Sequence, residues 1–196
     1  MRNPLNSWAK SDSYETHVED NETLQIAPFE FFVGDNDLAL MKKLCKAGAE
    51  HRKFMRQIFV SMDIVAARYW WVQFDTFKIG VTANSTSTMH TIHKKPFELD
   101  DFSHERMKLM AENSLIETIN TMNIYREEFL RTGDKEAWYQ MIQLLPQSYN
   151  QRRTIVMNYE NVVNMIRQRS GHKLNEWAEF VDVLKQLPYI AELTEE

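Results

Sequence analysis

Apolar and polar residues alternate between Phe54 and Val65, and this alternation restricts the segment to an extended strand. A period of two is that of a strand with one buried face, and it differs from the 3.6-residue period of a helix. The apolar positions are Ile58, Val60, Met62 and Ile64, and the polar ones are Gln57, Ser61 and Asp63. A second strand is predicted over residues 24–33, where Pro28 limits it to a sheet edge or a bend.

The apolar spacing becomes helical in most of the remaining chain. Helices are predicted from residue 35 to about 48, 66 to 77, 103 to 131, 134 to 145, 153 to 169 and 174 to 187. Asp35 or Asn36 would cap the first of them, and Gly133 would end the third. The combination predicts an α+β fold with an antiparallel or mixed sheet and a helix-rich C-terminal half.

Length and composition favour one domain. The chain has 196 residues, of which 43% are hydrophobic, enough for one substantial core. Residues 1–23 are polar and aperiodic, so we expect a loosely held arm followed by a single domain over 24–196.

Charge and cysteine content exclude several classes of protein. A net charge of −5 provides no field that would attract a nucleic acid polymer or an anionic membrane. The single cysteine, Cys45, rules out an internal disulfide, and no apolar run approaches a membrane span or a signal peptide. A cytoplasmic protein is expected, and no glycine-rich nucleotide motif is present.

A polar run follows the large rings of Tyr69, Trp70 and Trp71. The stretch FDTFKIGVTANSTSTMH, residues 74–90, contains seven Thr, Ser and Asn side chains. Such a run is either a solvated connection or the wall of a pocket for a planar polar ring or a phosphate, because hydroxyls and amides both donate and accept hydrogen bonds. Composition alone leaves both interpretations open.

Histidines and arginines give weaker signals. His90 and His93 have an i, i+3 spacing that would suit a metal, but no carboxylate or cysteine at matching spacing completes a site. His51 is read as a capping or core-edge residue, with a catalytic base as the alternative.

The segment from Leu144 to Trp177 is the most basic part of this acidic chain. Asn158 and Arg169 are eleven positions apart, about three helical turns, so both would face one cleft. Four arginines lie here: Arg152, Arg153, Arg167 and Arg169. They form either a solvated face, with arginines favoured near a helix C-terminus, or a site for an anion.

These segments together resemble the flavin-dependent thymidylate synthase family. That family has a strand leading to Arg and Gln, then Arg-His-Arg, then Asn-Glu-x-Ser-x-Arg-Tyr, and later Leu-Pro, Asn-x-Arg-Ser, Leu-Arg and His-Ala-Gln-x-Glu. Arg68 and Gln73 keep the first spacing, and Asn84 and Ser87 match the second motif after one inserted residue. The later positions that match are Pro146, Asn158, Arg169, His172 and Glu176. The resemblance covers roughly residues 50–180.

Several family cations are replaced. Thr76 and Phe77 stand at the Arg and His of the triplet, and Lys78 keeps a cation at its third position. The Glu, Arg and Tyr of the second motif are Ser85, Met89 and His90, and the Arg of Asn-x-Arg is Glu160. In the family these cations hold FAD and the dUMP phosphate, so the departures bear directly on cofactor binding.

The resemblance implies reductive C5-methylation of dUMP or a related pyrimidine nucleotide, with FAD as cofactor and NADPH and methylene-tetrahydrofolate as co-substrates. It assigns the nucleotide to Gln73, Asn84, Ser85, Ser87 and Arg169, with Arg169 also as the catalytic group. It assigns the cofactor to Thr76, Lys78, Asn158 and His172. A homotetramer with sites between subunits is also implied. The alternative is a non-catalytic nucleotide-binding or scaffold protein of the same fold.

Overall fold

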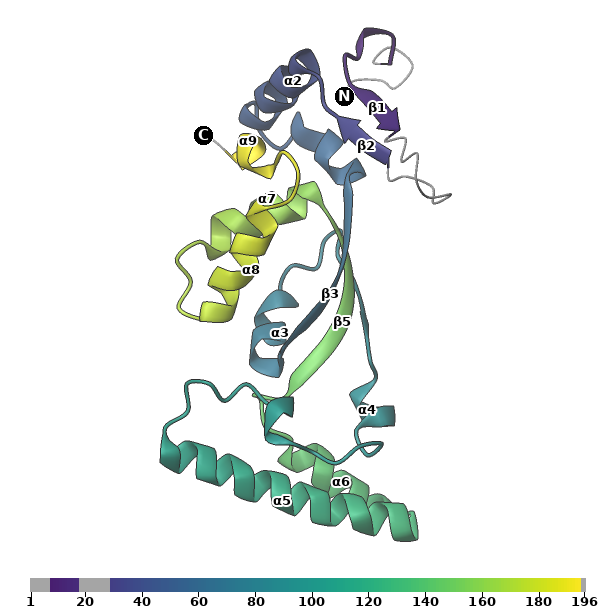
Figure 1. Cartoon of the computed structure of the whole chain (residues 1–196), viewed down its shortest axis with the longest axis vertical. Helices are drawn as coiled ribbons and strands as arrows, with labels where there is room; N and C mark the ends of the chain where they lie inside the picture. Colours follow the sequence, from purple (N-terminus) through teal and green to yellow (C-terminus); the bar gives the residue numbers. More distant parts are fainter. Residues whose placement is uncertain (1–7, 18–28, 195–196) are drawn as a thin grey trace, which may run out of the picture. The chain divides into compact units, whose positions relative to one another are not determined.

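The computed structural model describes residues 8–17 and 29–194, and its elements are shown in Figure 1. In chain order they are η1 (Trp8–Lys10), β1 (Tyr14–His17), β2 (Phe29–Phe32), α2 (Asp35–Lys46), η2 (Arg52–Gln57), β3 (Phe59–Ala67), α3 (Arg68–Phe74), β4 (Thr82–Ser85), α4 (Thr88–Thr91), η3 (Leu99–Asp101), α5 (Leu109–Thr132), α6 (Lys135–Leu144), β5 (Asn150–Asn158), α7 (Tyr159–Arg169), α8 (Asn175–Lys185) and α9 (Ile190–Thr194). The α+β class is confirmed.

Contacts divide the chain into two compact units. The first contains residues 1–59, 158–171 and 179–196, and the second contains residues 60–157 and 172–178. Each unit therefore combines segments that are far apart in the sequence. The division of the chain into an arm and a single domain stays a prediction.

The second unit contains a three-stranded sheet in the order β3-β5-β4. Along β3 the even-numbered residues from Val60 to Ala66 are buried or half-buried and the odd-numbered ones are exposed, as the alternation predicts. The predicted start at Phe54 was wrong, because Phe54 and Met55 are consecutive and both buried. A strand would send them to opposite faces, whereas the 3-10 helix η2 accommodates both.

An aromatic cluster forms the core beside this sheet. The ring of Trp70 lies 4.7 Å from that of Trp177 and 5.1 Å from that of Phe74, measured between centroids. These distances are typical of favourable aromatic pairs, and both indole rings are about 1% exposed or less. The helix predicted for this segment is therefore confirmed as α3, with shorter bounds.

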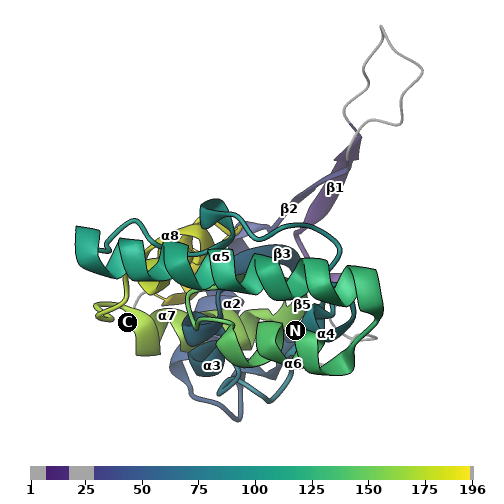
Figure 2. The same cartoon turned by 90° about the horizontal axis from the view of Figure 1, so that it is seen from below.

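A helical hairpin forms the other part of the second unit. Helices α5 and α6 lie side by side, as the views in Figures 1 and 2 both show. Gly133 ends α5 in the left-handed conformation, with φ of 69°, and Asp134 caps α6 by accepting a hydrogen bond from the Glu136 amide. The predicted start at Ser103 was wrong: α5 begins at Leu109, after η3 and a turn.

The segment 153–169 was predicted to be one helix, but its first part is a strand and only its second part is a helix. Residues 150–158 form β5, and α7 begins at Tyr159, with Asn158 as its N-cap. Ile155 and Tyr159 are four positions apart, so the strand imitates a helical spacing where it meets the helix. The helix predicted for 174–187 is confirmed as α8, with Trp177, Val181 and Leu184 buried.

The start of α2 is capped from a distant segment. The Asp12 carboxylate accepts hydrogen bonds from the amides of Asn36 at 2.9 Å and Asp37 at 3.0 Å. The prediction that Asp35 or Asn36 caps this helix was wrong, because the cap comes from more than twenty residues upstream. Gly34 leaves room for the Asp12 side chain, because a Cβ atom at position 34 would lie 2.2 Å from the Asp12 carboxyl carbon.

Residues 11–13 are thus anchored, although they belong to the segment expected to be loosely held. Tyr14 pairs with Phe32 in the antiparallel β1-β2 ribbon, and their rings stack at 5.4 Å. Of the strand predicted over 24–33, residues 29–32 form β2, and residues 24–28 lie outside the described part of the chain. Among the residues described, no helix has the length and apolar character needed to cross a membrane.

We expect Asp12→Ala to lower the free energy of unfolding by about 1–2 kcal/mol, because two amide donors at the start of α2 lose their acceptor. Urea unfolding measures the change. Asp35→Ala is the control, since Asp35 is exposed in the same helical turn but is not the cap. Equal losses in the two variants would contradict capping by Asp12.

Candidate functional site

The polar run after α3 forms a continuous edge of the second unit. Asn84 and Ser85 lie in β4, the strand at the edge of the sheet, opposite Thr154 and Arg153 of β5. All four residues of β4 are exposed. Ser87 follows as the N-cap of α4, and its carbonyl accepts a hydrogen bond from the Thr91 amide at 3.0 Å. Asn84, Ser85 and Ser87, which we call the polar edge, are therefore close together.

The end of α3 holds three further predicted site residues. The Gln73 carbonyl accepts hydrogen bonds from the Thr76 hydroxyl at 2.7 Å and the Thr76 amide at 3.2 Å. Thr76 therefore donates its hydroxyl proton to the helix terminus. The Gln73 side chain is half-buried, and Lys78 is exposed in the following turn.

Arg153 connects the polar edge to the aromatic core. Its guanidinium carbon lies 4.3 Å from the ring centroid of Trp71, within the range of a cation–π contact. Its Nη1 donates to Asp75 Oδ1 at 2.8 Å, and its Nε donates to Gln151 Oε1 at 3.0 Å. The Gln151 amide donates in turn to the Thr88 hydroxyl at 3.0 Å. Strand β5, helix α3 and helix α4 are thus joined through two side chains, Arg153 and Gln151.

A cavity of about 250 Å³ lies at the end of the polar edge. Its floor contains the buried side chains of Ile92 and Phe97, and Lys94 and Lys95 lie among its lining residues. Lys95 is paired with the Asp101 carboxylate, which raises the lysine pKa. Since pockets for larger ligands occupy about 300–1,000 Å³, this volume suits a single small ring or an anionic group.

Asn158 and Arg169 mark the two ends of α7 in the first unit. The Asn158 side chain accepts a hydrogen bond from the Asn161 amide at 3.1 Å, and the Asn161 side chain accepts one from the Asn158 amide at 3.2 Å. This reciprocal capping box commits the buried carbonyl oxygen of Asn158 to the helix start. Arg169 is the last residue of the helix and is half-buried.

The charge reversal at Glu160 is compensated by two arginines of η2. Arg52 Nε lies 3.3 Å from the Glu160 carboxylate, and Arg56 pairs with the same group. The hydrogen bond from Arg56 holds the pKa of the Glu160 carboxyl below its ordinary value, although burial acts in the opposite direction. The cluster has two guanidinium groups for one carboxylate, so it carries one net positive charge.

His172 and Glu176 make contacts inside the second unit. His172 Nδ1 accepts a hydrogen bond from the Leu174 amide at 3.1 Å, which in the neutral ring leaves the proton on Nε2. The Tyr69 hydroxyl donates to Glu176. Burial, followed by the contact with Glu176, raises the pKa of Tyr69 to about 12. Glu176 therefore positions a half-buried tyrosine that stays protonated at neutral pH.

Cys45 and His93 pack against neighbouring side chains, whereas His51 is exposed. Cys45 is 8% exposed, its sulfur lies 3.7 Å from that of Met55, and burial raises the pKa of its thiol. His51 is exposed at the N-cap of η2, without a side-chain capping bond. The His93 ring packs edge-on against Phe129 at 5.0 Å. Within the described ranges, no three His, Cys, Asp or Glu side chains gather as metal ligands.

Most predicted site residues fall in one unit. Those in the second unit are Gln73, Thr76, Lys78, Asn84, Ser85, Ser87 and His172. Asn158 and Arg169 belong to the first unit, so the facing of Arg169 and Ser87 stays a prediction. Sequence reasoning missed the contact of Arg153 with Trp71, and the pairing of Arg52 and Arg56 with Glu160.

Two solved structures are similar to this chain. Thymidylate Synthase X (ThyX) from Helicobacter pylori with FAD and dUMP has a TM-score of 0.64 and 16% sequence identity, over 83% of each chain. Flavin-dependent thymidylate synthase ThyX from Helicobacter pylori, complexed with FAD and dUMP, has a TM-score of 0.60 at the same identity and coverage. Neither a family model nor a curated protein sequence matches. The chain therefore has a flavin-dependent thymidylate synthase-like fold, as predicted.

We expect Arg153→Ala to lower the free energy of unfolding by about 1–3 kcal/mol, because it removes the contact with Trp71 and two hydrogen bonds. Chemical denaturation followed by tryptophan fluorescence measures this loss. Arg152→Ala is the matched control, since Arg152 is the exposed neighbour on the opposite face of β5. A loss as large in the control would show that Arg153 has no special role.

The Glu160 cluster predicts a dependence on pH. A carboxyl whose pKa is lowered in the folded state stabilises the fold above its unfolded pKa, with an ordinary value of 4.5, and this contribution disappears as the pH falls through the folded value. Glu160→Gln should therefore be less stable than the native chain at pH 7, with the difference shrinking below pH 4.5. Urea unfolding at several pH values measures the difference. Glu50→Gln, at an exposed pair with Lys53, should leave the profile unchanged.

Proposed function

We propose that the chain binds a pyrimidine nucleotide, with dUMP as the first candidate, on the polar edge of the second unit. The observation that carries this proposal is the polar edge itself, held by Arg153 against the aromatic core and set on a fold shared with proteins solved with dUMP. A solvated connection would not require the half-buried Arg153 and its hydrogen bonds behind it. This argument favours the pocket-wall interpretation of the polar run.

The chemistry of the edge matches a pyrimidine ring. Ring carbonyls and the ring N–H need both donors and acceptors, and we assign them to the Gln73, Ser85 and Ser87 side chains. Asn84 precedes Ser85 in β4 and points to the opposite face of the sheet, so its proposed contact with the nucleotide comes from that face. The adjacent cavity adds the ammonium groups of Lys94 and Lys95. We assign these lysines to the nucleotide phosphate, in place of the family arginines that the sequence lacks.

For the reaction, we propose C5-methylation of the bound pyrimidine with Arg169 as the catalytic group. C5 is a weak nucleophile until electron density moves toward it and leaves negative charge on the ring oxygens. A fixed guanidinium stabilises that charge by about 3–4 kcal/mol, by analogy with oxyanion donors. This role needs no thiolate, which agrees with the buried Cys45 and its raised pKa.

The residues that stand at the family's FAD-binding cations do not fit the cofactor's diphosphate. The Thr76 hydroxyl donates to Gln73, the Phe77 ring packs 6.0 Å from Trp177, and Glu160 is held by two arginines. Lys78, Asn158 and His172 Nε2 remain as our candidate contacts. The proposed use of FAD, NADPH and methylene-tetrahydrofolate therefore rests on whether the purified chain binds flavin.

A second candidate is a nucleotide-binding protein of this fold that catalyses no methylation. The Glu160 cluster favours it, because the carboxylate and both arginines satisfy one another inside the first unit. A protein that no longer binds the cofactor does not need a free cation at position 160. A glutamate paired with Arg52 and Arg56 is then acceptable there. Flavin binding distinguishes the two candidates.

A homo-oligomer, with a tetramer as the first expectation, is proposed for either candidate. The outward side chains of β3 and β5 are exposed, with Val65 at 56% and Val156 at 40%. The same face also carries the polar side chains of Ser61, Asp63, Arg152 and Thr154, so a partner surface there would be mixed in character. A second subunit would cover this face.

The test measures thermal stabilisation of the purified chain by dUMP and by FAD. Ligand at 100 times its dissociation constant should add about 2.7 kcal/mol to the free energy of unfolding. We expect dUMP to raise the melting temperature and Arg169→Ala to abolish the shift. Arg167→Ala is the matched control, because Arg167 is exposed in the same last turn of α7.

The outcomes separate the proposals. Absence of a dUMP shift in the native chain, or an unchanged shift in Arg169→Ala, overturns the nucleotide site as described. Yellow flavin absorbance that NADPH bleaches supports the methylation reaction. A dUMP shift without any FAD shift selects the non-catalytic candidate.

A further inference from the structure

Helix α5 has apolar side chains on two faces. Leu115, Ile119 and Met122 are buried in the core shared with α6. Leu109, Met110, Ile116, Ile124 and Leu130 point outward, with exposed fractions of 74%, 83%, 38%, 66% and 51%. A surface helix of a monomer usually has one apolar stripe and one polar face. The second stripe indicates that α5 has a further partner.

Seven exposed positions of α5 lie along one side of the helix and form what we call the seam. They are Leu109, Asn113, Ile116, Asn120, Ile124, Glu127 and Arg131, of which three are apolar. Met110 and Leu130 lie on the flanks of this seam. Spacings of three and four residues keep side chains on one side of a helix. At a rise of about 1.5 Å per residue, the seam is about 33 Å long.

The seam reads the same from both ends. The spacings from Leu109 to Asn120 are four, three and four residues, and those from Asn120 to Arg131 are four, three and four. Consider an antiparallel pair of identical helices with Asn120 at the centre. The numbers of two facing residues then add up to 240, so that residue 116 faces residue 124 of the other copy. Such self-complementarity is what a twofold interface between identical chains requires.

We propose that α5 pairs antiparallel with α5 of a second copy of this chain, about a twofold axis that passes by Asn120. Ile116 then packs against Ile124 of the second copy, and this contact occurs twice. Asn120 meets its own copy, where the two side-chain amides donate to and accept from each other. A polar pair of this kind fixes the register of a helix pair at some cost in stability.

The outer positions of the seam are also matched. Asn113 lies opposite Glu127 of the second copy, so an amide donor faces a carboxylate. Leu109 lies opposite Arg131, whose alkyl stem covers apolar surface while its charge stays in water. On the flanks, Met110 lies at the level of Leu130.

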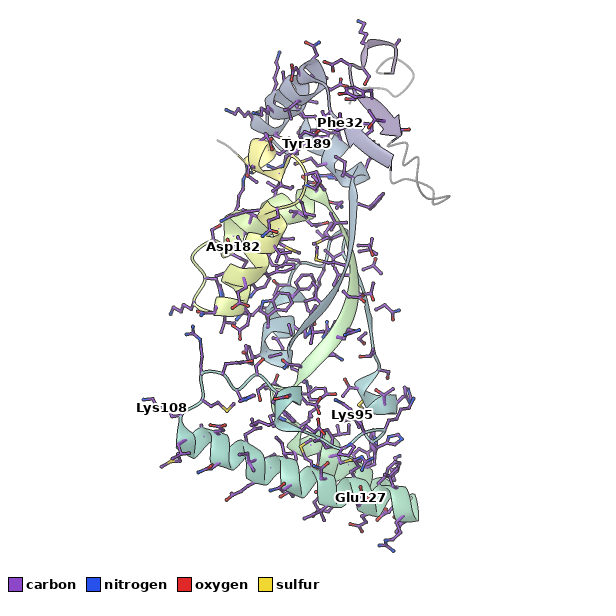
Figure 3. The ribbon with its side chains drawn as sticks, in the orientation of Figure 1. Phe32, Lys95, Lys108, Glu127, Asp182 and Tyr189 are labelled. Atoms are coloured by element: carbon purple, nitrogen blue, oxygen red, sulfur yellow. The ribbon has the colours of Figure 1, made fainter. Side chains whose placement is uncertain are left out.

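The central residue types of the seam fit a second copy. Any stripe along a helix shows spacings of three and four residues, but here Ile116 and Ile124 stand at equal distances from Asn120, and polar residues, Asn113 and Glu127, stand at equal distances beyond them. A twofold contact between identical chains pairs such positions. Figure 3 labels Lys108 next to the start of α5 and Glu127 near its other end, and in this register Glu127 lies opposite Asn113 of the second copy. The pairing does not rest on the proposed nucleotide chemistry.

Site-directed disulfides test the pairing directly. In a Cys45→Ala background, Asn120→Cys should form a disulfide-linked dimer under mild oxidation, because only the central residue meets itself. Ser114→Cys, exposed but outside the seam, should stay monomeric on a non-reducing gel. Asn113→Cys and Glu127→Cys should each stay monomeric alone and form a cross-linked pair when mixed.

The same experiment can overturn the proposal. A folded Asn120→Cys chain that does not cross-link would contradict the twofold axis at this residue. Cross-linking of Asn113→Cys with itself would indicate a parallel pair instead. Circular dichroism verifies that each variant is folded.

A second variant keeps the test independent of disulfide chemistry. We expect Ile124→Glu to raise the dissociation constant of self-association at least tenfold, measured by analytical ultracentrifugation, since each chain places a charge against Ile116. Thr121→Glu introduces the same charge at an exposed position outside the seam and should leave association unchanged. Unchanged association in Ile124→Glu would overturn the proposal whatever its effect on dUMP binding.

Discussion

The alternation of side chains along β5 is the constraint on which the second unit depends. Ile155 and Met157 are fully buried on one face, while Arg152, Thr154 and Val156 are exposed on the other. Because the period of a strand is two, a slip of one residue would exchange these sets. Arg153 reinforces the register, since its guanidinium reaches both the Trp71 ring and Asp75 only from the buried side. The same register places Ser85 opposite Arg153 and so positions the polar edge.

Sequence periodicity predicted the elements whose neighbours are local, and failed where structure depends on distant groups. The strand β3 and the helices α6 and α8 follow from spacing and nearby capping residues. The boundary between β5 and α7 was missed because Ile155 and Tyr159 imitate one helical turn, although the Asn158 and Asn161 capping pair marks the true start. The cap of α2 by Asp12 has no local signal.

The candidate site divides in the same way. Its hydroxyl and amide residues were visible as a compositional run, and the family resemblance ordered them. The stacking of Arg153 on Trp71 joins residues from two separate elements, so no spacing rule would find it. Likewise, the sequence shows a negative charge at Glu160 but not the two arginines of η2 that neutralise it.

The positions of the cations separate nucleotide binding from cofactor binding. A monophosphate needs a few donors beside a small pocket, and Lys94 and Lys95 line such a pocket, with Lys95 also paired with Asp101. A flavin diphosphate needs cations at positions where this chain has Thr76, Phe77 and Glu160, all engaged in contacts of their own. Our nucleotide proposal therefore depends on other residues than the proposal of a flavin, and the two need separate measurements.

The exposed apolar surfaces also constrain assembly. One belongs to the outward face of β3 and β5, and the other is the second stripe of α5. A closed tetramer of identical chains with three perpendicular twofold axes needs two different self-complementary contacts on each chain. The α5 pairing that we propose would supply one such contact, and the exposed face of β3 and β5 is the proposed surface for the other. Two weak contacts of this kind reinforce each other, because closing the assembly makes the last contacts intramolecular.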